Sequence, residues 1–433
     1  MNQNQNEKTL NPPQSPFILY PLSIILQKIP FILYPLSFIL LMYSSTFAQL
    51  YVYEPNHPEL KWESIETEHF LVHYHQGTAR TANVVAEIAE DIYPAITGLY
   101  DYEPSSKVEF IIKDTQDYAN GAAYFFDNKI EIWAENLDYV LRGTHNWLRD
   151  VITHEYIHII SLQKALKFGR KVPAGWFQVF GYEQERRQDV VRGFPDVLVS
   201  YPISGITVPV WFAEGVSQYQ SNAKRFDYRD SHREMILRDR IATGQLLTLE
   251  DMSVFGKNSI GNESSYNQGF AFVKYLAENY GEESLRKMAG AASAVTSLSF
   301  NRAMKKATGV PAKQLYRDWK ASLEETYTSR LQTIQANLHT GESFVDEGIG
   351  NMHPRVSPDG KKIAYLMTGD APYLSGNALV VETLGDPQRK KQMVAPRVTG
   401  SVSWSPDGRY LAYARITEVP ETQALFNDLY LYD

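Results

Sequence analysis

DVITHEYIHIIS, residues 150–161, places two histidines and a glutamate inside an otherwise apolar run. The apolar spacing from about residue 145 to 161 is typical of an α-helix. On a helix, His154 and His158 lie on one face about 6 Å apart along the axis, so both imidazoles can reach one Zn²⁺. Glu155 projects to the side of this pair, where it can polarise a metal-bound water without being a ligand. The stretch therefore predicts a catalytic metal site.

The alternative interpretation of the same stretch is an ordinary buried helix whose polar side chains are satisfied by neighbours. It is the less attractive one, because two histidines and a glutamate without partners are costly to bury. The chain has no cysteine, so a transition metal must be held by His, Asp or Glu. A catalytic zinc also needs a third protein ligand. The candidate is Glu214, near the start of the helix predicted at VWFAEGVSQYQ; the alternative is an exposed carboxylate favoured by the helix dipole.

Three further histidines and Asp150 are weaker candidates for a metal site. HFLVHYH, residues 69–75, has the alternation of a strand and places His69, His73 and His75 on one face. No carboxylate base accompanies them, so a metal is not favoured there. Asp150, one turn before His154, could orient a ligand, although a solvated carboxylate on the helix face is the favoured interpretation.

The surrounding sequence predicts an α+β fold. Alternating residues indicate strands at 69–75, 107–113 and 128–135, with a turn-rich segment between the last two. Helical spacing covers 79–99, and several helices are predicted between 266 and 335. Strands and helices in this order are typical of the α+β class.

Residues 166–210, between the two helices of the predicted metal site, are punctuated by Gly and Pro and are rich in aromatic residues. Three interpretations are open: a lid that shapes a substrate cleft, a patch that touches a membrane, and ordinary packing against the rest of the protein. Ordinary packing is the favoured one.

The C-terminal region contains a repeat. HPRVSPDGKKIAYLM (353–367) and SVSWSPDGRYLAYAR (401–415) are the same unit, two strands around an S-P-D-G turn. The two units begin at residues 353 and 401, and a repeat period of this size, 48 residues, indicates a β-propeller blade. The units resemble Tol-type propeller repeats, and NDLYLYD is similar to the third strand of such a blade. Because two units cannot close a ring of about four to eight blades, residues 339–433 are predicted to be the start of an incomplete propeller.

The N-terminus contains a duplicated apolar segment, PFILYPLSIIL at 16–26 and PFILYPLSFIL at 30–40. The second copy leads into small residues that suit signal peptidase, with cleavage after Ala48. Prolines and Lys28 interrupt the apolar stretch and argue against one long membrane span. Residues 1–48 are therefore predicted to be a signal peptide or, alternatively, an N-terminal anchor associated with a membrane. The protein is expected to be exported by a bacterium and to be periplasmic, outer-membrane-associated or secreted.

Length, composition and charge limit the number of domains and the classes of partner to be expected. At 433 residues with 44% hydrophobic content, the chain can form two or three domains with sizeable cores. The formal net charge is −8 and both signs are interspersed, so there is no basic surface for nucleic acid. A nucleic-acid partner is therefore excluded.

The predicted second helix resembles the gluzincin metallopeptidases, especially the aminopeptidase N branch. Trp211, Glu214, Gly215 and Tyr219 match its W-x-x-E-G-x-x-x-Y motif, whose glutamate is the third zinc ligand. The resemblance implies that His154, His158 and Glu214 hold Zn²⁺ while Glu155 acts as general base.

A second motif of that branch is similar to SSYNQGFAFVKYL, residues 264–276. In Y-x-x-G-x-x-x-x-x-x-L the tyrosine stabilises the tetrahedral oxyanion, and Tyr266 and Gly269 stand at the matching positions. The resemblance thus implies a catalytic Tyr266 as a hydrogen-bond donor to developing charge. A tyrosine packed beside a glycine is the alternative.

Two departures from the family limit what it implies. The interval from His158 to Glu214 is far longer than the roughly twenty residues typical of the family, so an insertion must fill it. The G-x-M-E-N motif that reads a free amino terminus is absent, and the corresponding region reads NGAAYFFDNKIEIW. Endopeptidase or oligopeptidase action is therefore expected in preference to aminopeptidase action.

The sequence predicts a signal peptide or anchor at 1–48, a gluzincin-like metallopeptidase domain at 49–338 and the start of a β-propeller at 339–433. The expected function is hydrolysis of a peptide or protein substrate by an exported zinc peptidase. The alternative is a non-catalytic binding protein in which the propeller captures a protein partner and the zinc domain is degenerate.

Overall fold

The computed structural model describes residues 57–137, 139, 141–142, 146–181, 196–219, 231–256, 259–371, 374 and 377–433. All of them belong to one compact unit, Glu54–Asp433. The predictions for residues 1–48 lie outside the described residues and stay predictions. The fold is α+β, as expected from the sequence.

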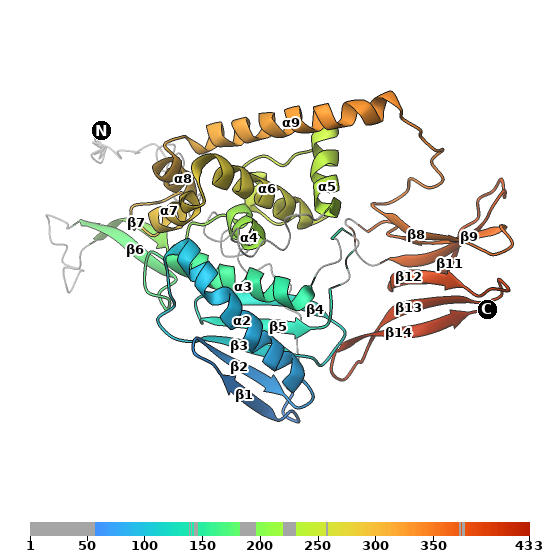
Figure 1. Ribbon diagram of the computed structural model, residues 1–433, viewed down its shortest axis with the longest axis horizontal. Helices are drawn as coiled ribbons and strands as arrows, with labels where there is room; N and C mark the ends of the chain where they lie inside the picture. Colours follow the sequence, from blue (N-terminus) through green and yellow to red (C-terminus); the bar gives the residue numbers. More distant parts are fainter. Residues whose placement is uncertain are drawn as a thin grey trace, which may run out of the picture. The chain divides into compact units, whose positions relative to one another are not determined.

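Five strands form a mixed sheet in the order β1-β2-β3-β5-β4 (Figure 1). They are β1 (Trp62–Glu66), β2 (Phe70–His75), β3 (Val108–Lys113), β4 (Ala119–Tyr124) and β5 (Lys129–Ala134). β2, β3 and β5 run parallel and confirm the three predicted strands, whereas β1 and β4 pair antiparallel at the two edges. β4 occupies the segment expected to be turn-rich. Its sequence, ANGAAY, has low intrinsic strand propensity, so pairing with β5 accounts for the strand.

Two helices, α2 (Ala79–Tyr100) and α3 (Trp147–Lys164), pack against this sheet and against each other. α2 contacts β2, and α3, the helix predicted from its apolar spacing, contacts β4 and β5. Aromatic rings fill the layer between them: the Phe70 ring lies 5.2 Å from the Tyr156 ring and 5.6 Å from the Phe110 ring. The side chain of Asn146 accepts a hydrogen bond from the Arg149 N–H and caps the start of α3. The two histidines predicted as metal ligands are thus fixed on a buried helix.

The rest of the predicted catalytic domain is helical. Its helices are α4 (Val210–Tyr219), α5 (Ser231–Ala242), α6 (Glu263–Tyr280), α7 (Glu283–Ala292), α8 (Phe300–Thr308) and α9 (Ala312–Ala336), with a short 3₁₀ helix, η3 (Asp251–Ser253). α6 to α9 confirm the helices expected between 266 and 335. The Phe272 ring lies 5.0 Å from Trp211 and 5.1 Å from Trp319. One apolar core therefore extends from the sheet through these helices.

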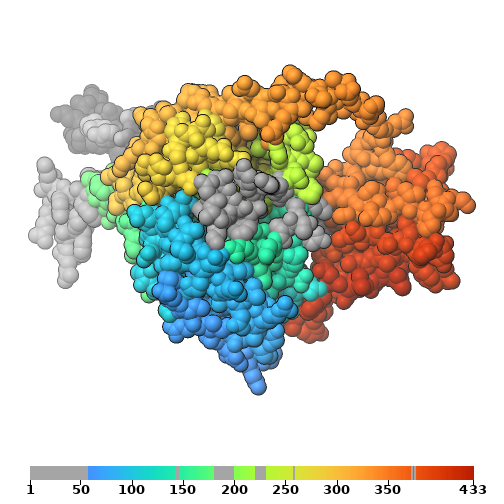
Figure 2. Space-filling model, viewed as in Figure 1, coloured from blue at the N-terminus to red at the C-terminus, as the bar shows by residue number. Residues whose placement is uncertain are grey.

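Residues within 166–210 form a two-stranded antiparallel ribbon, β6 (Ala174–Gly181) and β7 (Asp196–Ser204). Figure 1 shows it apart from the five-stranded sheet, and in Figure 2 part of its surface is visible in green. The favoured expectation of ordinary packing is wrong for Trp176 and Phe177, which are 62% and 57% exposed.

The C-terminal strands form two antiparallel sheets. The first sheet has the order β11-β10-β9-β8 and consists of β8 (Asn351–Val356), β9 (Lys362–Met367), β10 (Ala378–Thr383) and β11 (Gln392–Ala395). The second sheet has the order β12-β13-β14 and consists of β12 (Val398–Trp404), β13 (Leu411–Glu418) and β14 (Leu425–Tyr432). Both S-P-D-G turns end on a glycine with φ +73°. Buried residues of the two sheets share one core. The predicted two-strand units are confirmed, and the described residues form no closed propeller.

None of the helices in the described ranges combines the length and the apolarity needed to cross a membrane.

Candidate metal centre

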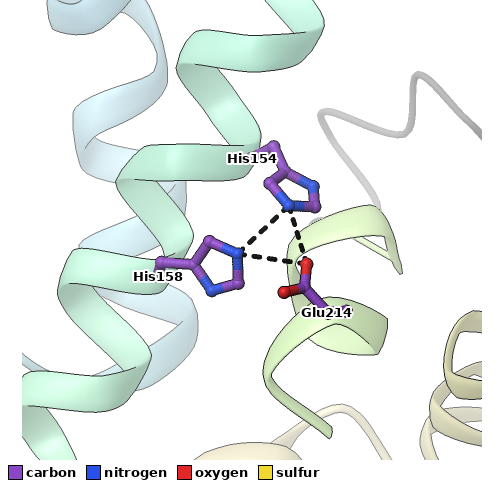
Figure 3. A group of neighbouring side chains, drawn as sticks. All are labelled: His154, His158 and Glu214. Atoms are coloured by element: carbon purple, nitrogen blue, oxygen red, sulfur yellow. Dashed lines mark hydrogen bonds and ion pairs between the residues drawn. The ribbon is translucent and has the colours of Figure 1, made fainter. Parts of the chain in front are cut away.

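His154 and His158 of α3 and Glu214 of α4 bring three ligand atoms together (Figure 3). The Nε2 atoms of the two histidines lie 3.1 Å apart, and Glu214 Oε2 lies 3.1 Å from His154 Nε2 and 3.3 Å from His158 Nε2. Within the described part of the chain, these three residues make up the group of His, Asp and Glu side chains that could hold a metal ion. The structure thus joins the three residues that the sequence proposed as ligands.

The spacing of these atoms fits a bound metal ion. A tetrahedral ion with ligands at about 2.0–2.1 Å separates its ligand atoms by about 3.3 Å, and the three observed distances are 3.1, 3.1 and 3.3 Å. Two imidazoles and one carboxylate are donors that suit first-row transition metals. Three protein ligands leave the fourth position of a tetrahedron open.

Glu214 owes its position to the packing of α4 on α3 and α6. It is only 8% exposed, so the alternative of an exposed carboxylate at a helix N-terminus is wrong. Burial alone would raise its pKa, but the imidazoles of His158 and His154 hold the pKa of Glu214 well below its usual range. In turn, burial would lower the pKa of His158, yet Glu214 raises it above the ordinary value. The carboxylate is therefore ionised, as a ligand must be.

Ser217 is a residue of the site that the sequence analysis missed. Its hydroxyl lies 3.2 Å from Nδ1 of His158 and is fully buried. A protonated Nδ1 that donates to this hydroxyl leaves the Nε2 lone pair facing Glu214 and the other imidazole. The available signal was spacing, since Ser217 follows Glu214 by one helical turn and shares its face of α4.

Glu155 lies between α3 and the edge strand β4. It is only 7% exposed. A Cβ atom at Gly121 would stand 2.7 Å from Glu155 Oε1 and 2.5 Å from Val151, so only glycine fits there. Burial raises the pKa of Glu155, the nearby imidazoles oppose this, and Glu214 adds to it. A carboxyl with a raised pKa is suited to receive and release a proton.

Tyr266 of α6 stands beside the first histidine. Its ring lies 6.2 Å from the His154 ring at an interplanar angle of 27°, and Phe255 stacks on it at 5.9 Å. The Arg142 guanidinium lies 5.4 Å from the same ring and is paired with Glu263 at 2.7 Å. Burial, with Glu214 next in importance, raises the pKa of Tyr266 well above its usual value. The phenol is therefore protonated and available as a donor.

The remaining candidates lie elsewhere. His69 Nδ1 is 2.7 Å from Glu90, His73 Nδ1 is 2.7 Å from the Ser64 hydroxyl, and His75 Nδ1 is 3.0 Å from the backbone carbonyl of Gln76. Each of these histidines thus has its own polar neighbour. Asp150 is 7% exposed, so the favoured interpretation of a solvated carboxylate is wrong.

Comparisons with known proteins give only distant likenesses. No protein-family profile matches the chain, and no curated protein matches it in sequence. Among solved structures, a proposed 6-phosphogluconolactonase from Bacteroides fragilis matches at a TM-score of 0.12 and 17% identity, over 22% of this chain and 32% of its own. An aminopeptidase N family protein from Idiomarina loihiensis matches at a TM-score of 0.32 and 10% identity, over 78% of this chain and 66% of its own.

Proposed function

We propose that this chain is an exported zinc-dependent peptidase with a gluzincin-like catalytic domain at 49–338. The observation that carries the proposal is the triangle of His154 Nε2, His158 Nε2 and Glu214 Oε2, with sides of 3.1 to 3.3 Å, beside a second buried acid, Glu155. Two histidines and one glutamate form the ligand set of several catalytic zinc sites. A second acid held apart from the ligands supports hydrolysis rather than a structural metal site.

Each residue has a chemical role in this proposal. Zinc, when bound, would polarise the scissile carbonyl and a water molecule. Glu155 takes the proton of the water and passes it to the leaving amine. The Tyr266 hydroxyl donates to the developing oxyanion.

The position of the sheet supports a peptide substrate. β4 is an edge strand of the five-stranded sheet and lies against the metal-binding helix. An extended peptide can pair with such an edge, which would bring its backbone carbonyl toward Glu155. The β4 sequence lacks the G-x-M-E-N motif, and this favours endopeptidase or oligopeptidase action.

The other parts of the proposal concern location and partners. Export to the periplasm, the outer membrane or the medium rests on residues 1–48, which lie outside the described residues. The two C-terminal sheets, β8–β11 and β12–β14, are proposed as the first blades of a propeller that could bind a protein partner.

A digest of a broad peptide library with and without a chelator tests the enzyme proposal. We expect cleavage that chelation abolishes and added zinc restores. Glu155→Gln should keep one zinc per chain but lose hydrolysis by about 100-fold or more. Glu382→Gln, which alters an equally buried glutamate of β10, is the matched control and should cleave normally. Turnover unchanged in Glu155→Gln would refute the assignment, and absent cleavage together with capture of a protein would favour the binding protein.

A further inference from the structure

The β6–β7 ribbon carries an unusual concentration of exposed apolar side chains. Large ones with more than two fifths of their surface exposed are Trp176, Phe177, Val179, Val199 and Tyr201, and Val172 just before β6 is exposed as well. Among the described residues, the two strands contact each other far more extensively than they contact any other helix or strand. Contiguous exposed apolar surface of this kind marks a binding surface in a soluble protein.

Strand register gathers most of these side chains on one face. Phe177 pairs with Tyr201 and Val179 pairs with Val199, so these four side chains point to the same side of the ribbon. Trp176 pairs with Pro202 on the opposite side. Both faces of the ribbon therefore present apolar groups, as expected of an element that is surrounded by an apolar medium rather than laid on a flat partner.

The chain leading into the ribbon is basic. Residues 156–181 contain four cationic side chains, on Lys164, Lys167, Arg170 and Lys171, and no acidic one. Lys171 is exposed and Arg170 partly so, directly before the first strand. Aromatic side chains flanked by Lys and Arg are typical of segments that sit at the boundary between lipid headgroups and acyl chains. Cations at that level are attracted to anionic headgroups.

We propose that the β6–β7 ribbon inserts its apolar side chains into the surface of a bilayer that contains anionic lipids, with Arg170 and Lys171 at the headgroups. Where residues 1–48 are kept as the N-terminal anchor, the apolar copies at 16–26 and 30–40 hold the protein near a membrane. One weak anchor holds a protein only transiently, and stable attachment takes two signals. The ribbon is such a second signal. Because it lies between α3 and α4 in the sequence, it would keep these metal-binding helices close to the membrane.

The absence of cysteine allows a test at single positions of the full chain. Val199→Cys is labelled with an environment-sensitive NBD fluorophore and mixed with vesicles of phosphatidylcholine and phosphatidylglycerol, or of phosphatidylcholine alone. We expect NBD emission to rise and shift to the blue with the anionic vesicles. Leu429→Cys is the control, since Leu429 is 86% exposed on β14. The N-terminal segment is present in both proteins, so a difference between them reports the ribbon itself.

Two double variants test whether the aromatic and the basic side chains bind the vesicles. In the Val199→Cys background, Trp176→Ser with Phe177→Ser should weaken binding to the anionic vesicles by about tenfold. Arg170→Gln with Lys171→Gln should weaken it by a similar factor, and added salt should make this difference smaller. Lys361→Gln with Lys362→Gln, another exposed basic pair, should change nothing.

Three results would overturn the proposal: no spectral change at position 199 with any vesicle, equal changes at 199 and 429, or a change without lipid that grows with protein concentration. The last would show that a second copy covers the ribbon. Chelation of zinc should leave the membrane signal intact. The membrane proposal can therefore fail or succeed independently of the peptidase proposal.

Discussion

Gly215 of α4 and Gly269 of α6 bring the backbones of these two helices into contact beside the metal centre. A Cβ atom at Gly215 would lie 2.4 Å from the carbonyl oxygen of Gly269, and one at Gly269 would lie 2.4 Å from the carbonyl oxygen of Trp211. Neither helix can carry a side chain at the crossing. The two glycines of the motifs therefore have a packing role: they fix the helix that carries Glu214 against the helix that carries Tyr266.

Gly215→Ala is expected to force α4 away from α6. Overpacking of this kind costs about 1–3 kcal/mol in the free energy of unfolding, and the shift of Glu214 should weaken zinc binding. Gly98→Ala is the control, because Gly98 is exposed within α2 and has open space around its Cβ position; it should stabilise by up to about 1 kcal/mol. Urea unfolding gives the free energy of unfolding of both variants. Equal values for Gly215→Ala and the parent would contradict the close backbone contact between α4 and α6.

Glu214→Ala should remove one of the three ligands. We expect zinc affinity to fall by more than about 100-fold, while the helices keep their fold. His73→Ala serves as control, since His73 neighbours Ser64 on β1 rather than the metal centre. Metal analysis of the purified variants decides the matter: full zinc content in Glu214→Ala would show that the third ligand lies elsewhere, and zinc loss in His73→Ala would point to the strand histidines.

Ser217→Ala should act through His158. Without the hydroxyl, Nδ1 loses the partner that orients the ring, and zinc affinity should fall by about 10–100-fold. Ser217→Thr retains a hydroxyl and should recover part of the loss. Competition with a fluorescent zinc chelator gives the affinities. Identical values for the alanine variant and the parent would mean that the 3.2 Å contact does not hold the ring.

Zinc binding should depend on pH through His158. Glu214 raises the pKa of His158 above 6.5 in the metal-free protein, so a proton occupies the imidazole below that value and must leave before the ring can bind metal. Apparent zinc affinity should therefore increase as pH rises from 6 to 8. Calorimetry in buffers of different ionisation enthalpy counts the protons released. No proton release near pH 6 would contradict the expected direction.

Gly121→Ala should impair Glu155 more than the metal ligands. The added methyl group meets the Glu155 carboxylate and Val151, so either β4 or the carboxylate must move. We expect peptide hydrolysis to fall by about tenfold or more with zinc still bound. Steady-state kinetics and metal analysis on the same sample separate the two effects, and zinc loss in proportion to activity would place Gly121 in support of the ligands instead.

The sequence by itself determined the features that arise within a few residues of each other. The spacing of apolar residues marked α3, and one helical turn between His154 and His158 placed both imidazoles on the same face of it. Alternation marked β2, β3 and β5, and the S-P-D-G turns marked the C-terminal strand pairs. Each of these signals is local, because helix and strand periods are set by backbone geometry.

Tertiary structure alone decided which distant parts meet. The ribbon inserted between His158 and Glu214 does not prevent α4 from packing on α3, and no local pattern encodes that approach. β4 became a strand because β5 pairs with it, against the low propensity of ANGAAY. Exposure of Trp176 and Phe177 could not be inferred either, since an apolar residue is buried only if the fold supplies something to cover it.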